Sequence, residues 1–82
     1  MSNTITIPIQ GSVDRILAKA ADEAAENGFA FTGNSHGGVI ASEDYRITYE
    51  VHDRVLVLKV EDKPFYVPMS AIEAKIRDWL EA

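Results

Sequence analysis

The strongest constraint on the fold is a run of short strand-like segments enclosed by two helical ones. From Phe29 to Val67, apolar and polar residues alternate over short stretches that turn residues interrupt, which is typical of half-buried β-strands. An alanine-rich amphipathic segment precedes this run, and a shorter amphipathic segment containing Trp79 follows it. This pattern predicts an α+β domain, because each element must bury its apolar side against another one.

The N-terminal segment Thr4–Ile9 is predicted to be a half-buried strand. Ile5, Ile7 and Ile9 occupy alternate positions and therefore share one face of the strand. Pro8 lacks the amide hydrogen that a sheet ladder uses, so we expect this strand to lie at an edge of the sheet or to end at Pro8.

A helix is predicted between Ser12 and Asn27-Gly28. Ser12 can cap the first turn, and Gly28 suits the left-handed conformation in which many helices end. The apolar stripe has helical spacing and consists of Val13, Ile16, Leu17, Ala20, Ala21 and Ala24. Because alanine is small, we expect this helix to lie close against a sheet.

Four strands and one short extended piece are predicted after this helix, at Phe29–Thr32, Gly38–Ser42, Tyr45–His52, Val55–Val60 and Phe65–Val67. Asp53-Arg54 is predicted to form the hairpin turn before the last full strand. One face of that strand carries Leu56, Leu58 and Val60, and the other face carries Val55, Val57 and Lys59.

The last helix is predicted to begin at Ser70 and to run almost to the C-terminus. Ser70 and Glu73 have the spacing of a capping box. Glu73 and Arg77 form a favourable pair four residues apart. An apolar stripe that we expect to anchor the helix on the sheet consists of Ile72, Ile76, Trp79 and Leu80.

Together these segments predict one α+β domain that spans residues 1–82. The short connections favour antiparallel neighbours. We therefore expect a two-layer sandwich, in which an antiparallel meander sheet is covered on one face by two helices, in the order β-α-β-β-β-β-α. The other face of the sheet would be wet or used for contact.

Charge and hydropathy narrow the classes of function. The formal net charge is −5 and the eight basic residues are scattered along the chain, so nucleic acid binding is disfavoured. The longest aliphatic run, Val55–Leu58, is far too short to span a membrane. The first ten residues lack the charged and apolar regions of a signal peptide. We therefore expect a cytoplasmic protein.

No catalytic, cofactor-binding or metal-binding residue is assigned from the sequence. The Gly33–Gly38 loop has glycines at phosphate-loop spacing, but Val39 and Ile40 stand where a lysine and a hydroxyl residue are needed. We interpret it as a hairpin loop. The chain has no cysteine, and its two histidines, His36 and His52, lack ligand spacing. The carboxylates fall on a helix face or in turns, where solvated charge is expected.

The aromatic residues have two interpretations. Tyr45 and Tyr49 share one strand face, and Phe65 and Trp79 are placed to meet the aromatic residues of the sheet. Core packing is the usual reason for such spacing. The alternative is an exposed contact surface formed by Val55, Val57 and Tyr66. We expect a monomer or a weak homodimer, and the dimer would use this surface.

The sequence from Phe31 onward resembles the polyhydroxyalkanoic acid system protein family, whose members are encoded near polyester-granule genes. The matching features are Phe31-Thr32-Gly33, Gly37-Gly38, Tyr45, the Val55–Val60 strand, Lys63-Pro64-Phe65, Ile72, Ile76 and Leu80. The resemblance implies a cytoplasmic, non-enzymatic protein linked to polyhydroxyalkanoate granules, and it supplies no catalytic residue.

Two functional hypotheses follow from the sequence. The first is a small non-catalytic accessory or interaction protein, whose partner is a protein or a granule surface. The second is a binding protein for a small apolar ligand, held in a pocket between the helices and the sheet. A closed core without such a pocket would exclude the second hypothesis.

Overall fold

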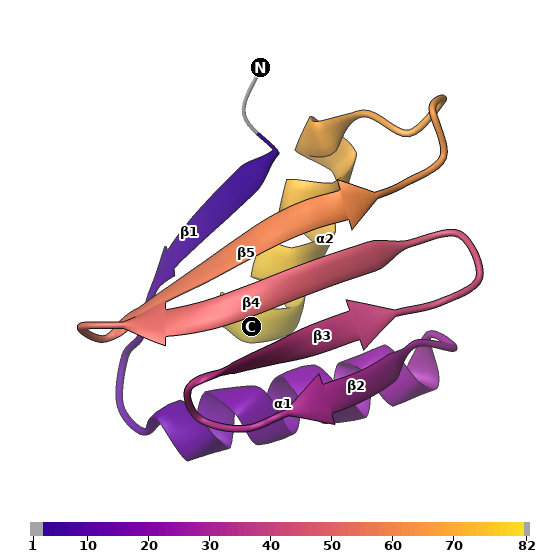
Figure 1. Ribbon diagram of the computed structural model, residues 1–82. Coiled ribbons are helices and arrows are strands. Elements are labelled where there is room, and N and C mark those ends of the chain that lie inside the picture. Colours follow the sequence, from indigo (N-terminus) through magenta and orange to yellow (C-terminus); the bar gives the residue numbers. More distant parts are fainter. Residues whose placement is uncertain (1–2, 82) are drawn as a thin grey trace.

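The computed structural model describes residues 3–81 as a five-stranded sheet with two helices packed on it. The elements follow the order β1 (Thr4–Pro8), α1 (Val13–Glu26), β2 (Ala30–Gly33), β3 (Gly37–Ala41), β4 (Arg46–His52), β5 (Val55–Asp62) and α2 (Met69–Glu81) (Figure 1). The predicted α+β class and the predicted order of elements are confirmed.

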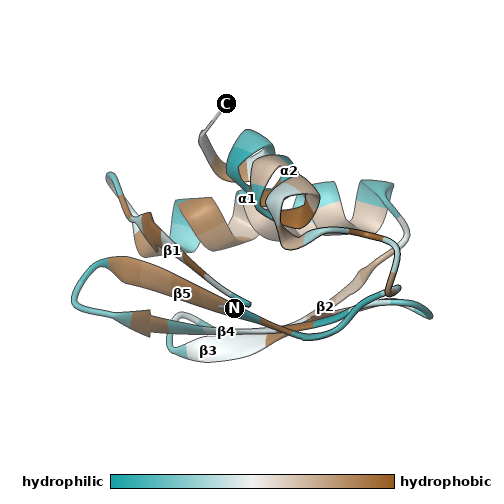
Figure 2. Cartoon of the chain, turned by 90° about the horizontal axis from the view of Figure 1, so that it is seen from above, coloured by the Kyte–Doolittle hydropathy of each residue, from teal (hydrophilic) through white to brown (hydrophobic). Residues whose placement is uncertain are grey.

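All neighbouring strands in the sheet are antiparallel, and their order is β1-β5-β4-β3-β2. The four strands β2 to β5 form a meander, whereas β1 lies at the far edge and pairs with β5. The chain must therefore pass from one edge of the sheet to the other between β1 and β2, and α1 makes this crossing. Figure 2 shows that α1 and α2 cover the same face of the sheet.

The core lies between the sheet and the helices. Alternate residues of β1, β4 and β5 are buried on the helical side, namely Ile5, Ile7, Ile47, Tyr49, Leu56, Leu58 and Val60. The intervening positions, such as Thr6, Glu50 and Lys59, are exposed on the other side. The period-two alternation in the sequence thus becomes one apolar and one wet face.

Both predicted ends of α1 are present in the structure. The Ser12 hydroxyl accepts a hydrogen bond from the Arg15 amide at 3.4 Å. At the other end, Gly28 has a φ of 80°, which a residue with a side chain rarely adopts. Ala20 and Ala24 are buried in the contact with the sheet layer, so the small side chains allow the close approach that the sequence predicted.

The β2–β3 hairpin is shaped by Tyr49, whose ring lies over two glycines. The strand register places Gly38 beside Tyr49 and Gly33 beside Gly38. The Tyr49 ring stacks on Phe31 with centroids 5.4 Å apart, and its hydroxyl donates to the Asn34 carbonyl oxygen at 2.8 Å. Burial raises the pKa of the Tyr49 hydroxyl above its usual value, since the phenolate would lose hydration.

Two arginines donate hydrogen bonds to backbone carbonyl oxygens in β1 and in the segment that follows it. Asp53 and Arg54 form the predicted hairpin turn with φ of 47° and 62°, as tight turns that match the strand twist require. The Arg54 guanidinium donates to the Ile9 carbonyl oxygen at 3.4 Å and also to that of Gly11. Arg77 of α2 donates to the Thr6 carbonyl oxygen at 3.3 Å, which occupies an acceptor on the β1 edge strand.

Two local predictions are wrong. The segment Phe65–Val67 is not extended, because the Val67 amide donates to the Pro64 carbonyl oxygen at 3.1 Å and closes a turn. The flanking residues Pro64 and Pro68 have no amide hydrogen to donate to a neighbouring strand. Ser70 does not cap α2, because the helix begins at Met69 and the Ile72 amide donates to the Pro68 carbonyl oxygen at 3.4 Å.

Neither helix within residues 3–81 has the length and apolar character that crossing a membrane requires.

We predict that Gly38→Ala destabilises the protein by about 2–3 kcal/mol, as overpacking of a filled core does. A Cβ at this position would collide with the Thr32 carbonyl oxygen and would lie 2.7 Å from Cε1 of Tyr49. Urea denaturation measures the change. Thr32→Ala on the exposed side of the neighbouring strand is the control and should shift the free energy by less than about 0.5 kcal/mol. Equal stability of the two variants would contradict the close contact of Tyr49 with Gly38.

Candidate ligand-binding pocket

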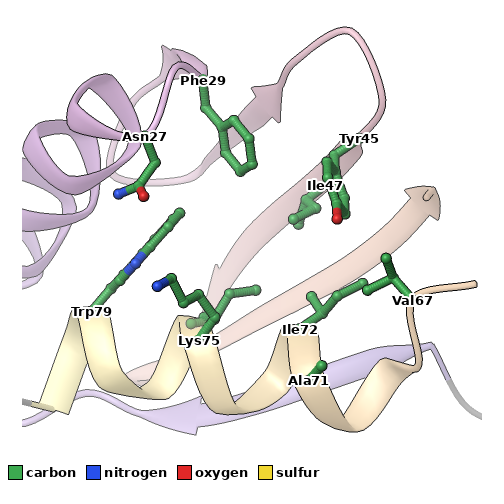
Figure 3. A pocket seen from close by; sticks show the side chains of 10 residues that line it. Asn27, Phe29, Tyr45, Ile47, Val67, Ala71, Ile72, Lys75 and Trp79 are labelled. Atoms are coloured by element: carbon green, nitrogen blue, oxygen red, sulfur yellow. The ribbon is translucent and has the colours of Figure 1, made fainter. Parts of the chain in front are cut away.

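An open apolar pocket lies where α2 meets the end of α1 and the start of β4. It has a volume of about 300 Å³, which is at the lower end of the range of small-molecule sites. Its lining comes from several elements and consists of Asn27, Phe29, Tyr45, Ile47, Val67, Ala71, Ile72, Lys75, Ile76 and Trp79 (Figure 3).

Three aromatic rings form the walls of the pocket. The centroid of the Phe29 ring lies 5.6 Å from that of Tyr45 and 5.9 Å from that of Trp79. The Phe29 amide donates to the Ala24 carbonyl oxygen at 2.8 Å, directly after the turn at Gly28. The end of α1 therefore places Phe29 between the other two rings, and the prediction that Trp79 meets the aromatic residues of the sheet is confirmed.

The floor of the pocket belongs to the hydrophobic core. Ile47, Ile72 and Ile76 are buried in the core cluster and also line the pocket. Branched side chains held in a packed core have few rotamers available. The floor is thus formed before any ligand arrives.

The polar groups of the pocket are few. Lys75 is the only charged residue among those that line it, and its side chain is exposed. Figure 3 shows its amino group pointing toward the side formed by Trp79 and Asn27. The side-chain nitrogen Nδ2 of Asn27 donates to the Glu23 carbonyl oxygen at 2.7 Å. The end of α1 therefore holds this side chain in place.

A pair of exposed aromatic residues lies beside the pocket, on the connection between β5 and α2. Phe65 is 94% exposed and Tyr66 is 74% exposed, and their rings meet edge to face with centroids 5.6 Å apart. The Lys63 ammonium donates to the Val67 carbonyl oxygen at 2.7 Å and supports this turn. Val67 also lines the pocket. The prediction that Phe65 meets the core aromatic residues is therefore wrong.

The predicted contact surface of Val55, Val57 and Tyr66 is not continuous. Val55 and Val57 lie half-exposed on the outer face of β5. Val55 begins this strand, whereas Tyr66 follows its other end (Figure 1). The structure therefore keeps the two valines together and places Tyr66 apart, with Phe65.

The Gly33–Gly38 loop forms a hairpin, as interpreted from the sequence. The Asn34 side-chain oxygen accepts hydrogen bonds from the amides of His36 at 2.8 Å and Gly37 at 3.3 Å. These two amides are therefore occupied by the loop itself, whereas a phosphate loop directs such groups to its ligand.

The two histidines lie near a shallow hollow of about 650 Å³ on the outer face of the sheet. His36 lines this hollow with Glu50 and Lys59. His52 Nε2 lies 3.2 Å from Glu50 Oε2, and both side chains are largely exposed. Among the described side chains of residues 3–80, no three histidine or acidic groups come together as a metal site would need.

Sequence reasoning missed Lys75, although the sequence carries a signal for it. Lys75 follows Ile72 by three residues and precedes Trp79 by four, so it falls within the apolar stripe of α2. A charged residue within an apolar stripe lies either at the border of the buried surface or beside a space that the apolar side chains leave open. In this structure it stands at the pocket.

No family model, no curated protein and no solved structure matches this chain. The resemblance to the polyhydroxyalkanoic acid system family stays a prediction.

We predict that Trp79→Ala destabilises the protein by about 3–5 kcal/mol, as the loss of a large buried aromatic side chain does. Trp79 is only 7% exposed and joins α2 to Phe29. Chemical denaturation measures this change. The control is Tyr66→Ala, which removes an exposed ring and should cost less than about 0.5 kcal/mol. A loss below about 1 kcal/mol for Trp79→Ala would show that the ring does not anchor the helix.

Proposed function

We propose that this chain is a non-catalytic binding protein that holds a small molecule with an apolar body in the pocket between α2, the end of α1 and the start of β4. The observation that carries the proposal is the open volume of about 300 Å³ between Phe29, Tyr45 and Trp79. An apolar surface of this kind costs free energy while it stays hydrated, and a ligand that covers it recovers that free energy.

The lining of the pocket favours binding over catalysis. Among the described residues that line it, Lys75 and Tyr45 are the only ones with titratable side chains, and the structure shows no hydrogen bond between these two. Acid–base or nucleophilic catalysis by protein groups usually relies on two groups within hydrogen-bond reach.

The size of the pocket sets the size of the ligand. A volume of about 300 Å³ corresponds to about ten water molecules, so we expect a ligand of about ten non-hydrogen atoms. Small ligands gain at most about 1.5 kcal/mol per such atom, and usually much less. A dissociation constant between about 10 μM and 1 mM is therefore expected.

The position of Trp79 provides a direct test, because it is the only tryptophan of the chain and it lines the pocket. We predict that linear and aromatic compounds of about ten non-hydrogen atoms, such as octanol, change the Trp79 fluorescence in a saturable manner. The blocking variant is Ala71→Phe, which fills the pocket from α2. Its matched control is Ala74→Phe, at an exposed position of the same helix that does not line the pocket.

The expected result is that Ala71→Phe abolishes the fluorescence change and that Ala74→Phe preserves it. If no compound produces a saturable change in the wild-type protein, the pocket does not bind small molecules. If both variants respond as the wild type does, the compounds bind elsewhere.

A second candidate function is that of an accessory protein that binds a partner surface through Phe65 and Tyr66. The specific observation in favour is the exposure of both rings on a turn flanked by prolines. Large exposed aromatic residues at one place often mark contact surfaces. The surface of a polyester granule is the partner that the sequence resemblance suggests. A cytoplasmic location and a monomeric or weakly dimeric state remain parts of this proposal.

We predict that the protein cosediments with polyhydroxybutyrate particles and that the double variant Phe65→Ala/Tyr66→Ala stays in the supernatant. The control is Val55→Ala/Val57→Ala, which changes the outer sheet face and leaves the turn that carries Phe65 and Tyr66 intact. If Phe65→Ala/Tyr66→Ala still sediments with the particles and Val55→Ala/Val57→Ala does not, the contact lies on the sheet face. A wild-type protein that does not sediment with the particles would exclude the granule surface as the partner.

A further inference from the structure

The position of Lys75 adds a chemical requirement to the pocket. Its backbone lies within the apolar stripe of α2, between Ile72 and Trp79. The four-carbon stem of a lysine can cover apolar surface while its ammonium group stays in water. Lys75 therefore belongs to the pocket wall along its stem and places one positive charge at the opening (Figure 3).

The Lys75 ammonium has no partner among the side chains that the structure describes, which are those of residues 3–80. No ion pair or hydrogen bond to another described residue involves it. Two acids of α2 lie near Lys75 in the sequence. Glu73 is bound to Arg77 with a distance of 2.9 Å between Glu73 Oε2 and Arg77 Nε, and Asp78, one turn further on, makes no ion pair with Lys75. The positive charge at the opening is thus available to a group that enters the pocket.

The other pocket residues do not offset this charge. The described side chains that line the pocket include no carboxylate. Asp78, three residues after Lys75 on α2, is not among the residues that line the pocket. Among the described residues that line the pocket, Lys75 is therefore a single cation beside an apolar wall.

We infer that the pocket selects an organic acid, in which an apolar body of about ten non-hydrogen atoms lies against Phe29 and Trp79 and a carboxylate binds Lys75. This inference rests on the proposed binding function. One ammonium matches a singly charged carboxylate, whereas phosphate groups are usually bound by several donors or by arginine forks. The ligand class is thus an aliphatic or aromatic monocarboxylate.

Paired ligands with the same apolar body separate the charge from the pocket. Octanoate and octanol differ mainly in the carboxylate, and both can be titrated against Trp79 fluorescence at fixed ionic strength and neutral pH. The test variant is Lys75→Met, which keeps a long apolar side chain and removes the charge. The matched control is Lys59→Met, which makes the same change in net charge on the exposed outer face of the sheet.

The expected result is that Lys75→Met weakens octanoate binding roughly threefold to tenfold more than it changes octanol binding, as the loss of one partly exposed charge pair does. Lys59→Met should leave both affinities unchanged. If the ratio of the two affinities is the same in Lys75→Met as in the wild type, or if the wild type binds octanol and not octanoate, the inference is wrong and the proposed binding function stands. If neither compound binds the wild-type protein, the binding function itself fails, and the inference fails with it.

Discussion

Both the stability of the fold and the shape of the candidate site depend on how α2 packs on the sheet. The core is covered on its helical side by three buried residues of α2, Ile72, Ile76 and Trp79. Beside these anchors, however, Ala71 and Lys75 of the same helix line the pocket. One side chain is too short to fill the space and the other carries a charge that stays in water. The helix is therefore firmly anchored and still leaves a pocket along its side.

The walls of this pocket come from segments that other constraints hold in place. Phe29 is placed by the end of α1, where Gly28 allows the chain to turn. Tyr45 stands just before β4, and its carbonyl oxygen accepts a hydrogen bond from the Ser42 amide at 2.8 Å. Because these positions follow from backbone hydrogen bonds as well as from packing, the shape of the pocket does not depend on a ligand. Such a preformed site loses little conformational entropy on binding.

The connection between β5 and α2 links the two proposed functions. Val67 is part of the pocket wall, and the two exposed rings of Phe65 and Tyr66 directly precede it. The Lys63 ammonium holds the Val67 carbonyl oxygen, so a displacement of the turn would also move Val67. A partner that binds the aromatic turn and a ligand that binds the pocket would therefore act on the same short segment.

The sequence by itself determined the types and order of the elements. The alternation of Ile5, Ile7 and Ile9, and of Leu56, Leu58 and Val60, depends only on the two-residue period of a strand. The tertiary structure decided which apolar residues are covered and where space remains. Phe65 and Trp79 are both aromatic and near the last helix, yet one is 94% exposed and the other 7%. This difference arises because burial and pocket volume depend on how elements distant in the sequence are seated against one another, which no local period records.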